Sequence, residues 1–244
     1  MAQKKQYIFG THSVSAILQK QPERLLHLYF QKDKQDSTLL SLAKNYHIKT
    51  SFLNRTELDR MSENGVHQGI IAECMPAKTY SENDLDELVE SLTEPAFLLI
   101  LDGVQDPHNL GACLRSADAA GVHAVIAPKD KSASITPTVS KVASGAAETI
   151  PFIQITNLAR TIRELKDKNI WVFGAAGEAT KTLYQANLKV PLAIVMGAEG
   201  QGLRRLTREH CDELLNIPMQ GSVSSLNVSV ATGIFLFEAL RQRS

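Results

Sequence analysis

The chain has few of the features that mark secreted, metal-binding or membrane proteins. Its 244 residues include only 3 cysteines, which are widely spaced and form no Cys-x-x-Cys pair. Such a set predicts neither a disulfide framework nor a metal site, and it favours a reduced, cytoplasmic setting. The longest apolar runs, such as Phe97–Leu101, are far too short to span a bilayer. The first residues contain no apolar signal-peptide core, so no secretory leader is expected.

The net charge of the chain is zero, but its charged residues are unevenly distributed along the sequence. The chain has 26 Lys and Arg against 26 Asp and Glu. Residues 1–76 carry a net charge of +3, residues 77–94 carry −5, and residues 95–244 carry +2. An acidic strip therefore separates two mildly basic flanks. This distribution permits a nucleic-acid partner through local basic patches, but it does not require one.

The first flank, residues 1–76, alternates helical and extended patterns and predicts a small α/β/α domain. Its polar loop residues at 11–13 and 67–68 could contact a ligand or could simply form turns and caps. Between Pro76 and Pro95, Ser81 or Asn83 can cap a short acidic helix, and composition changes on both sides. Residues 77–94 are therefore predicted to be a linker.

The second flank, residues 95–244, alternates short apolar strands with helices, which predicts a mostly parallel sheet covered on both faces. The expected strands include 97–101, 122–127, 150–155, 170–173, 192–196 and a short strand ending at 217–219. One expected helix follows the first strand. Two more run from about 136 to 148 and from 157 to 168, and a further helix ends the chain. The predicted fold class is α/β.

Two of the last strands run into loops rich in glycine and serine, at 197–203 and 221–227. Such loops expose backbone amides at the carboxyl ends of strands, where α/β proteins bind small polar ligands. The first loop is not a dinucleotide fingerprint, because Arg205 stands where the third glycine belongs, and no Gly-Lys pair indicates a phosphate loop. A nicotinamide-dependent dehydrogenase is therefore disfavoured. Spacing alone leaves two interpretations open, a cofactor pocket or a pair of structural turns.

Three motifs then narrow the choice: LDGVQDPHNLGACLRSADAAG at 101–121, IVMGAEGQGL at 194–203 and IPMQGSVSSLNVSVA at 217–231. With them the chain resembles the TrmH/SpoU group of RNA ribose 2′-O-methyltransferases over essentially its whole length. Within that group it is most similar to the bacterial type that methylates a guanosine of large-subunit (23S) ribosomal RNA. The stretches at 10–13 and 67–70 resemble the group's substrate-binding domain, which has a ribosomal-protein-like RNA-binding fold.

The resemblance implies a SPOUT-type catalytic domain in which the C-terminal segment threads through a loop as a trefoil knot. General topology rules disfavour such threading, so only the resemblance predicts it. It further implies S-adenosylmethionine as the methyl donor, no metal, RNA or a pre-50S particle as the partner, and a homodimer with the active site near its interface.

By the same resemblance, the cofactor lies between two loops beside the turn at 175–177. Backbone groups can hold the edge of the adenine while apolar side chains cover its faces. Without the resemblance, the apolar members of this set would be ordinary core residues. The implied cofactor-binding residues are Ala176, Met196, Gly197, Ala198, Gly202, Ile217, Pro218, Met219 and Leu226.

The implied catalytic residues are Asn109, Arg115, Glu199, Ser224 and Asn227. In the group, the arginine matching Arg115 often acts as the base that deprotonates the ribose hydroxyl. A guanidinium stays protonated under nearly all conditions, so clamping the adjacent phosphate and stabilising the developing alkoxide is an equally good role.

The other catalytic residues each have a supporting role. Asn109 could orient Arg115 or the ribose, or cap its helix. Glu199 could accept a hydrogen bond from Asn109 or Arg115. Ser224 and Asn227 precede the last helix, whose N-terminus favours an anion.

Two alternatives remain at this point. A sister enzyme with the same chemistry could modify transfer RNA or another ribosomal site, because the N-terminal domain would choose the substrate. A non-enzymatic RNA-binding or ribosome-assembly protein would share the fold but would not bind S-adenosylmethionine.

Overall fold

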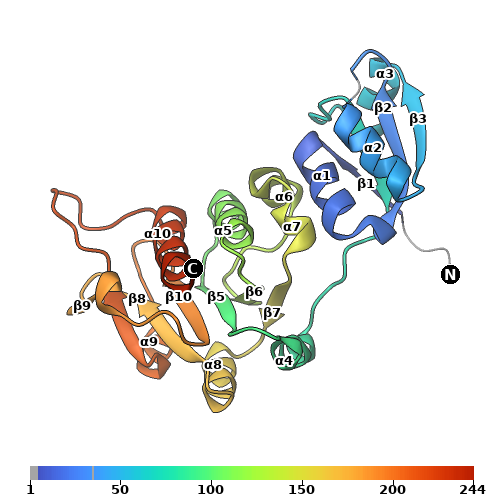
Figure 1. The fold of residues 1–244 in the computed structure, drawn as a ribbon. Coiled ribbons are helices and arrows are strands. Elements are labelled where there is room, and N and C mark those ends of the chain that lie inside the picture. Colours follow the sequence, from blue (N-terminus) through green and yellow to red (C-terminus); the bar gives the residue numbers. More distant parts are fainter. Residues whose placement is uncertain (1–4, 35) are drawn as a thin grey trace. The chain divides into compact units, whose positions relative to one another are not determined.

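The computed structural model describes residues 5–34 and 36–244. Residues 1–4, on which the expectation of no secretory leader partly rests, lie outside the described residues. The chain divides into two compact units (Figure 1). Unit 1 comprises the residues up to Lys78 together with Ser144–Thr149, and unit 2 comprises Thr79–Ala143 and Ile150–Ser244. The predicted boundaries of the functional domains remain predictions.

Unit 1 is built on a mixed sheet whose strand order is β1-β4-β2-β3. Strand β4 is antiparallel to β1 and β2, while β2 and β3 are parallel. Apolar residues of α1 and α2, such as Ile17 and Leu39, pack on Leu28 and Phe30 of the sheet. The elements are β1 (Gln6–Phe9), α1 (Thr11–Lys20), a 3₁₀ turn (Pro22–Arg24), β2 (Leu25–Gln31), α2 (Ser37–Asn45), β3 (Lys49–Leu53), α3 (Arg55–Met61), β4 (Ile70–Cys74) and α7 (Ala146–Thr149).

Local sequence explains where two of these helices begin. Asp36 accepts hydrogen bonds from the backbone N–H groups of Thr38 and Leu39 at the start of α2. Asn54 caps α3 and forms a capping box with Glu57. Strand β1 was not predicted, because four residues are too few for an alternating pattern to be recognised.

Unit 2 is organised around a sheet in which every described strand pair is parallel. Its strand order is β7-β6-β5-β10-β8-β11-β9. The prediction of an α/β domain with a mostly parallel sheet is therefore confirmed, while the knot remains a prediction. The strands are β5 (Phe97–Asp102), β6 (Ala124–Pro128), β7 (Phe152–Ile155), β8 (Trp171–Ala175), β9 (Lys181–Thr182), β10 (Leu192–Gly197) and β11 (Glu213–Asn216).

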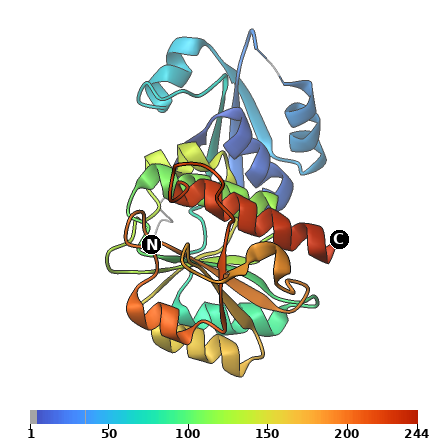
Figure 2. The same cartoon turned by 90° about the vertical axis from the view of Figure 1, so that its left-hand side faces the viewer.

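Helices cover both faces of this sheet (Figures 1 and 2). On one face lie α5 (Pro107–Ala119), α6 (Pro137–Ala143) and α10 (Val228–Arg243). On the other lie α4 (Glu82–Ser91), α8 (Leu158–Asp167) and α9 (Arg205–His210), and a 3₁₀ turn (Leu183–Gln185) follows β9. Buried residues of α4 and α8, such as Leu85 and Ile162, share one core with Ile100 and Val195 of the sheet. No helix among the described residues is long and apolar enough to cross a membrane.

Three sequence expectations differ from the structure in detail. The helix expected at 136–148 is split into α6 and α7, because Ser144 and Gly145 adopt left-handed backbone angles of φ 51° and 95°. The strand expected to end at 217–219 ends at Asn216, since Pro218 has no N–H to donate to a strand ladder. The acidic segment 77–94 contains the expected helix, but Leu85 of α4 is buried in the core of unit 2.

Candidate active site

Three loops of unit 2 leave the same edge of the sheet, at the carboxyl ends of adjacent strands. Strands β10, β8 and β11 are neighbours in the sheet and end at Gly197, Ala175 and Asn216. The backbone N–H of Ala176 donates to the carbonyl of Leu215 at 3.0 Å, which joins two of these strand ends. Of the residues implied in cofactor binding, five lie at or next to these strand ends, where open α/β sheets bind ligands: Ala176, Met196, Gly197, Ala198 and Ile217. The other four, Gly202, Pro218, Met219 and Leu226, lie farther along the two loops that follow β10 and β11.

The first of these loops, called here the glycine loop (residues 197–203), is closed by its own backbone. Ala198 and Gly202 exchange two hydrogen bonds, of 3.2 and 2.9 Å. A Cβ at Gly197 would stand only 2.1 Å from the carbonyl carbon of Gly202, so no other residue fits there without a backbone shift. Gly202 has a left-handed φ of 65°. The glycines thus permit a tight, fixed loop.

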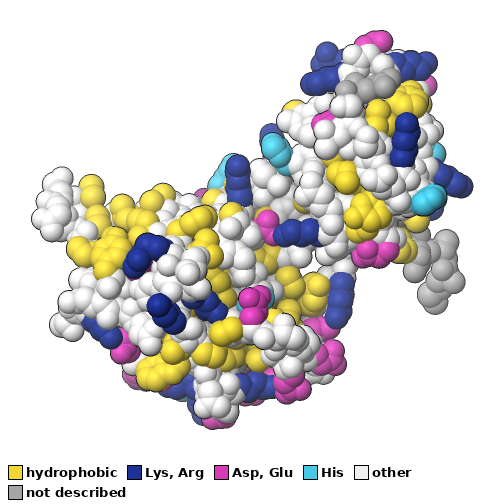
Figure 3. Space-filling view, viewed as in Figure 1, with side chains coloured by type: hydrophobic (Ala, Val, Ile, Leu, Met, Phe, Trp, Pro, Cys, Tyr) yellow, Lys and Arg dark blue, Asp and Glu magenta, His cyan; other side chains and the backbone are white. Residues whose placement is uncertain are grey.

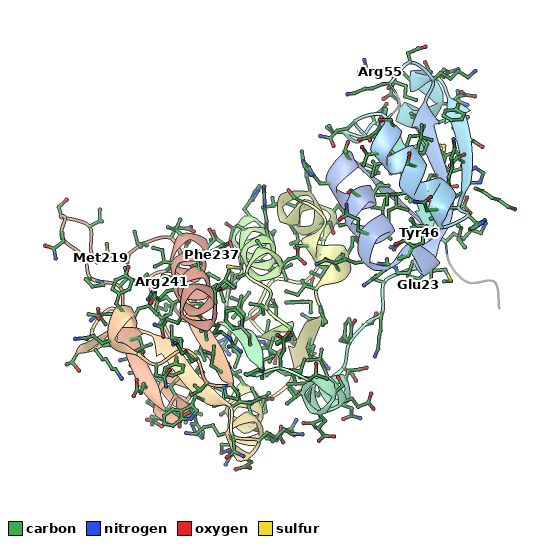
Figure 4. The ribbon with its side chains drawn as sticks, viewed as in Figure 1. Glu23, Tyr46, Arg55, Met219, Phe237 and Arg241 are labelled. Carbon is green, nitrogen blue, oxygen red and sulfur yellow. The ribbon has the colours of Figure 1, made fainter. Side chains whose placement is uncertain are left out.

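The second loop, called here the serine loop (residues 217–226), is open. Within the described part of the chain, no hydrogen bond joins its residues to one another or to neighbouring segments. Ile217, Met219 and Leu226 are half-buried, whereas Ser224 is exposed. Figure 4 shows Met219 on this loop, away from the body of α10. The loop presents apolar side chains beside the glycine loop without being fastened in place.

Asn227 connects residues from all three sequence motifs. Its Nδ2 donates to Oδ1 of Asn109 at 3.0 Å and to Oε1 of Glu199 at 2.5 Å. Its Oδ1 accepts hydrogen bonds from the backbone N–H and the hydroxyl of Ser229, at 2.9 and 2.6 Å, and so caps α10. Both the nitrogen and the oxygen of the Asn227 side-chain amide are therefore engaged in hydrogen bonds. Because Oδ1 of Asn109 is an acceptor in this chain of bonds, its Nδ2 donor is left for a ligand.

Helix packing holds this chain of hydrogen bonds in place. Asn109 stands near the start of α5 and is only 7% exposed, and Asn227 stands at the start of α10. The two helices are joined by a contact of 3.5 Å between Sγ of Cys113 and Oγ1 of Thr232. Burial raises the pKa of the Cys113 thiol to about 11, so this thiol is a neutral packing group.

A cavity of about 280 Å³ lies in front of these residues. Polar backbone and side-chain groups from the turn after β5, the start of α5 and the glycine loop surround it, together with Val228 at the start of α10. Its lining residues are Gly103, Val104, Gln105, Asp106, Asn109, Ala198, Glu199, Gln201 and Val228. Polar groups from three elements therefore converge on one space, as in a small-molecule or nucleotide site.

Some predicted details of the site are different in the structure. Glu199 accepts its hydrogen bond from Asn227, where Asn109 or Arg115 was expected. Asn109 does not cap α5, because Asp106 accepts the hydrogen bond from the backbone N–H of His108 at 3.0 Å. Arg115 is exposed and has no hydrogen-bond or ion-pair partner among the described residues.

Sequence reasoning also missed several residues of the cavity wall. Val104, Gln105 and Gln201 were not singled out, although they lie inside the quoted motifs. Their position in the sequence could have identified them, since each follows the end of a buried strand. Fully buried Asp102, the last residue of β5, also went unremarked.

The site has groups that fit S-adenosylmethionine. The free amide donor of Asn109 and the carboxylate of Glu199, which both line the cavity, suit a ligand that carries an adenine, a ribose and an ammonium group. No cluster of three or more His, Cys, Asp or Glu side chains suited to a metal ion occurs in the described ranges.

Comparison with known proteins identifies the family of the chain. The model of the SpoU rRNA methylase family matches residues 96–237. The chain belongs to this family. A second model, of the substrate-binding domain of RNA 2′-O ribose methyltransferases, matches residues 7–80. The family match spans all three motifs, so the chain of hydrogen bonds among Asn109, Glu199 and Asn227 lies within the family's characteristic region.

Individual relatives extend the comparison over nearly the whole chain. The 23S rRNA (guanosine-2′-O-)-methyltransferase RlmB of Escherichia coli (strain K12) is 60% identical over 240 residues, which cover 97% of this chain and 98% of that protein. A solved RNA 2′-O ribose methyltransferase is 27% identical with a TM-score of 0.76, covering 99% of this chain and 90% of that one. The SpoU methyltransferase AviRb of Streptomyces viridochromogenes, solved with AdoMet, has the same fold at 22% identity, with a TM-score of 0.75 and coverage of 98% and 90%.

Proposed function

We propose that this protein transfers a methyl group from S-adenosylmethionine to the ribose 2′-hydroxyl of a specific guanosine in 23S ribosomal RNA, as a step of ribosome biogenesis in the cytoplasm. The observation that carries the proposal is the meeting of Asn109, Glu199 and Asn227 at one cavity. The name of the relative that is 60% identical supports the choice of RNA and nucleotide.

The donor is assigned to the edge where β10, β8 and β11 end. Its adenine would lie between the glycine loop and the half-buried side chains of Ile217, Met219 and Leu226. Met196 and Ala176 form the buried floor, and Pro218 shapes the serine loop. Bound there, S-adenosylmethionine supplies an activated methyl group, and no metal takes part in our proposal.

The protein's own groups then position the acceptor. The free Nδ2 of Asn109 donates to a ribose oxygen, while the second carboxylate oxygen of Glu199 can accept a hydrogen bond or the proton that leaves the 2′-hydroxyl. Arg115, exposed and without a described partner, clamps the neighbouring phosphate and stabilises the developing alkoxide. Ser224 would join the site only when the serine loop closes. Alignment of oxygen, methyl and sulfur supplies much of the rate.

Partner binding is assigned to the rest of the chain. The N-terminal domain, predicted at residues 1–76, binds the RNA or pre-50S particle, in line with the match of residues 7–80.

We further propose a homodimer. Hydrophobic side chains gather over α10 (Figure 3), where Val230 and Phe237 are 51% and 48% exposed. Such a surface on a helix beside the site suits a second copy of the chain.

The test is methyl transfer from labelled S-adenosylmethionine to 23S ribosomal RNA that lacks its modifications, with transfer RNA in parallel. A single ribose-methylated guanosine in the ribosomal RNA is expected. Labelling of transfer RNA instead would keep the chemistry and overturn the substrate. Calorimetric titration without RNA completes the test, because a protein that does not bind the cofactor would be an RNA-binding or assembly protein.

A further inference from the structure

A fully buried carboxylate stands at the end of β5, immediately before the turn that lines the cavity. Asp102 is 0% exposed. Its Oδ2 accepts a hydrogen bond from the backbone N–H of Arg204 at 2.9 Å. Among the described residues, its Oδ1 has no hydrogen bond and makes an ion pair with Nε of Arg204, at 3.4 Å. Burying a carboxylate with one oxygen unbonded is costly, so a role beyond stability is expected.

Asp102 holds both ends of the glycine loop. Strands β5 and β10 pair in parallel, and Gly197, where the loop begins, is the register partner of Asp102. Arg204 directly follows Leu203, where the loop ends, and is bound by the side chain of the same aspartate. One residue thus fastens the entry of the loop through the sheet and its exit through a carboxylate.

The guanidinium of Arg204 also contacts the turn on the other side of the cavity. A Cβ at Gly103 would lie 3.2 Å from Nη2 of Arg204, so the glycine leaves room for this side chain. Gly103 lines the cavity, and the same turn leads through Asp106 to Asn109. The Arg204 side chain itself is 43% exposed, so its removal leaves no large internal cavity.

We propose that Asp102 and Arg204 form a latch that positions the glycine loop for cofactor binding. Both are positioning residues, because neither lines the cavity. The inference rests on the proposed function for the identity of the cofactor, but the latch itself is a property of the loop.

The test compares Arg204→Ala with Arg205→Ala. Both variants lose one positive charge, but Arg205 is an exposed neighbour that pairs with Glu209 at 3.0 Å. In calorimetry without RNA, Arg204→Ala and Asp102→Asn should bind S-adenosylmethionine at least tenfold more weakly than the parent, and Arg205→Ala within twofold. The double variant Asp102→Asn/Arg204→Ala should be no weaker than the weaker single variant, because each change breaks the same pair.

Kinetics and hydrogen exchange distinguish positioning from other roles. The KM for S-adenosylmethionine should rise at least tenfold in Arg204→Ala, with kcat at saturating donor within threefold. A raised KM for RNA with unchanged donor affinity would overturn the latch, since Arg204 would then contact RNA.

Without any cofactor, amides of 198–203 should exchange at least tenfold faster in Arg204→Ala than in Arg205→Ala. Equal exchange rates in the two variants would also overturn the proposed latch. A parent protein that binds no cofactor, yet shows this exchange difference, would overturn the proposed function and leave the latch standing.

Discussion

The glycine loop and the serine loop leave the same edge of one parallel sheet, yet they are held very differently. The glycine loop is fastened by two backbone hydrogen bonds between Ala198 and Gly202 and by the contact of Arg204 with Asp102. The serine loop has no hydrogen bond among the described residues until Asn227 begins α10. The first loop is held by these contacts, whereas the second lacks such bonds and is expected to be the more mobile of the two.

The difference matches the work that each loop would do under the proposed function. Glu199 on the glycine loop must face the reacting atoms, where a fixed dipole or charge lowers the barrier because it need not reorganise. The serine loop carries Ile217, Met219 and Leu226, which would cover a cofactor that has to enter and leave. A loop that closes over its ligand must be weakly held before the ligand arrives.

The largest expected effect concerns Arg115, which belongs to neither loop. Arg115→Ala should lower methyl transfer by about 10³-fold, because under the proposed function it removes the cation that faces the developing charge. The affinity for S-adenosylmethionine should stay within about threefold, since both loops are intact. Transfer rates and calorimetry measure the two effects. Arg163→Ala, an exposed arginine on α8 at the opposite face of the sheet, is the matched control. Near-normal transfer by Arg115→Ala would remove Arg115 from the catalytic set.

A pair of glycine substitutions tests the contrast directly. Gly197→Ala places a Cβ 2.1 Å from Gly202, whereas a Cβ at Gly221 of the serine loop meets nothing within 4 Å. Gly197→Ala should lower the free energy of unfolding by about 3 kcal/mol, as overpacking against backbone does. Gly221→Ala should be nearly neutral. Urea unfolding checks both, and equal effects would mean that the two loops are equally constrained.

Hydrogen exchange measures the mobility of each loop. Amides of 217–226 should exchange rapidly in the free protein and slow by about tenfold or more when S-adenosylmethionine is added, because the ligand orders the loop. The amide of Gly202, already bonded to the carbonyl of Ala198 at 2.9 Å, should change little. A serine loop that is protected without ligand would contradict the comparison.

The proposed homodimer can be tested on α10, the helix that follows the serine loop. If Phe237 lies in the proposed interface, Phe237→Glu should weaken the homodimer by about tenfold or more, because the change would bury a charge in an apolar contact. Sedimentation at several concentrations measures the dissociation. Leu206→Glu, at an exposed leucine on α9, is the control and should leave the dimer intact. If Phe237→Glu remains a dimer, the contact lies elsewhere.

The smallest effect concerns the far end of α10, the helix that begins at the serine loop. Hydrogen bonds from Arg241 and Gln242 lower the pKa of Glu238 to about 2. Since the pKa is lower in the folded than in the unfolded chain, this carboxylate stabilises the fold above about pH 4.5, and the contribution is lost as pH falls towards 2. Glu238→Gln should therefore flatten the dependence of Tm on pH in this window. Glu209→Gln, in an exposed ion pair, should not.

Much of unit 2 could be predicted because its signals are local. Buried strands such as Phe97–Asp102 are continuous apolar runs, and the cap at Asn157 marks its own helix, since its side chain accepts from the backbone N–H of Arg160. Short elements carry too few residues for a pattern, so β9 was missed. Ser144 and Gly145 split a predicted helix through backbone angles that composition does not reveal.

In the candidate site, too, local features could be predicted from the sequence, whereas contacts between distant residues could not. The sequence by itself determined the parallel α/β class, the two loops and, by resemblance, the residues of the three motifs, because each depends on neighbours within a few positions. Only the tertiary structure decided that Asn227 bonds Asn109 and Glu199, and that Asp102 holds Arg204. These partners are separated by 118, 28 and 102 positions. They meet because parallel strands bring their carboxyl ends to one edge, and strand order is set by packing of the whole sheet.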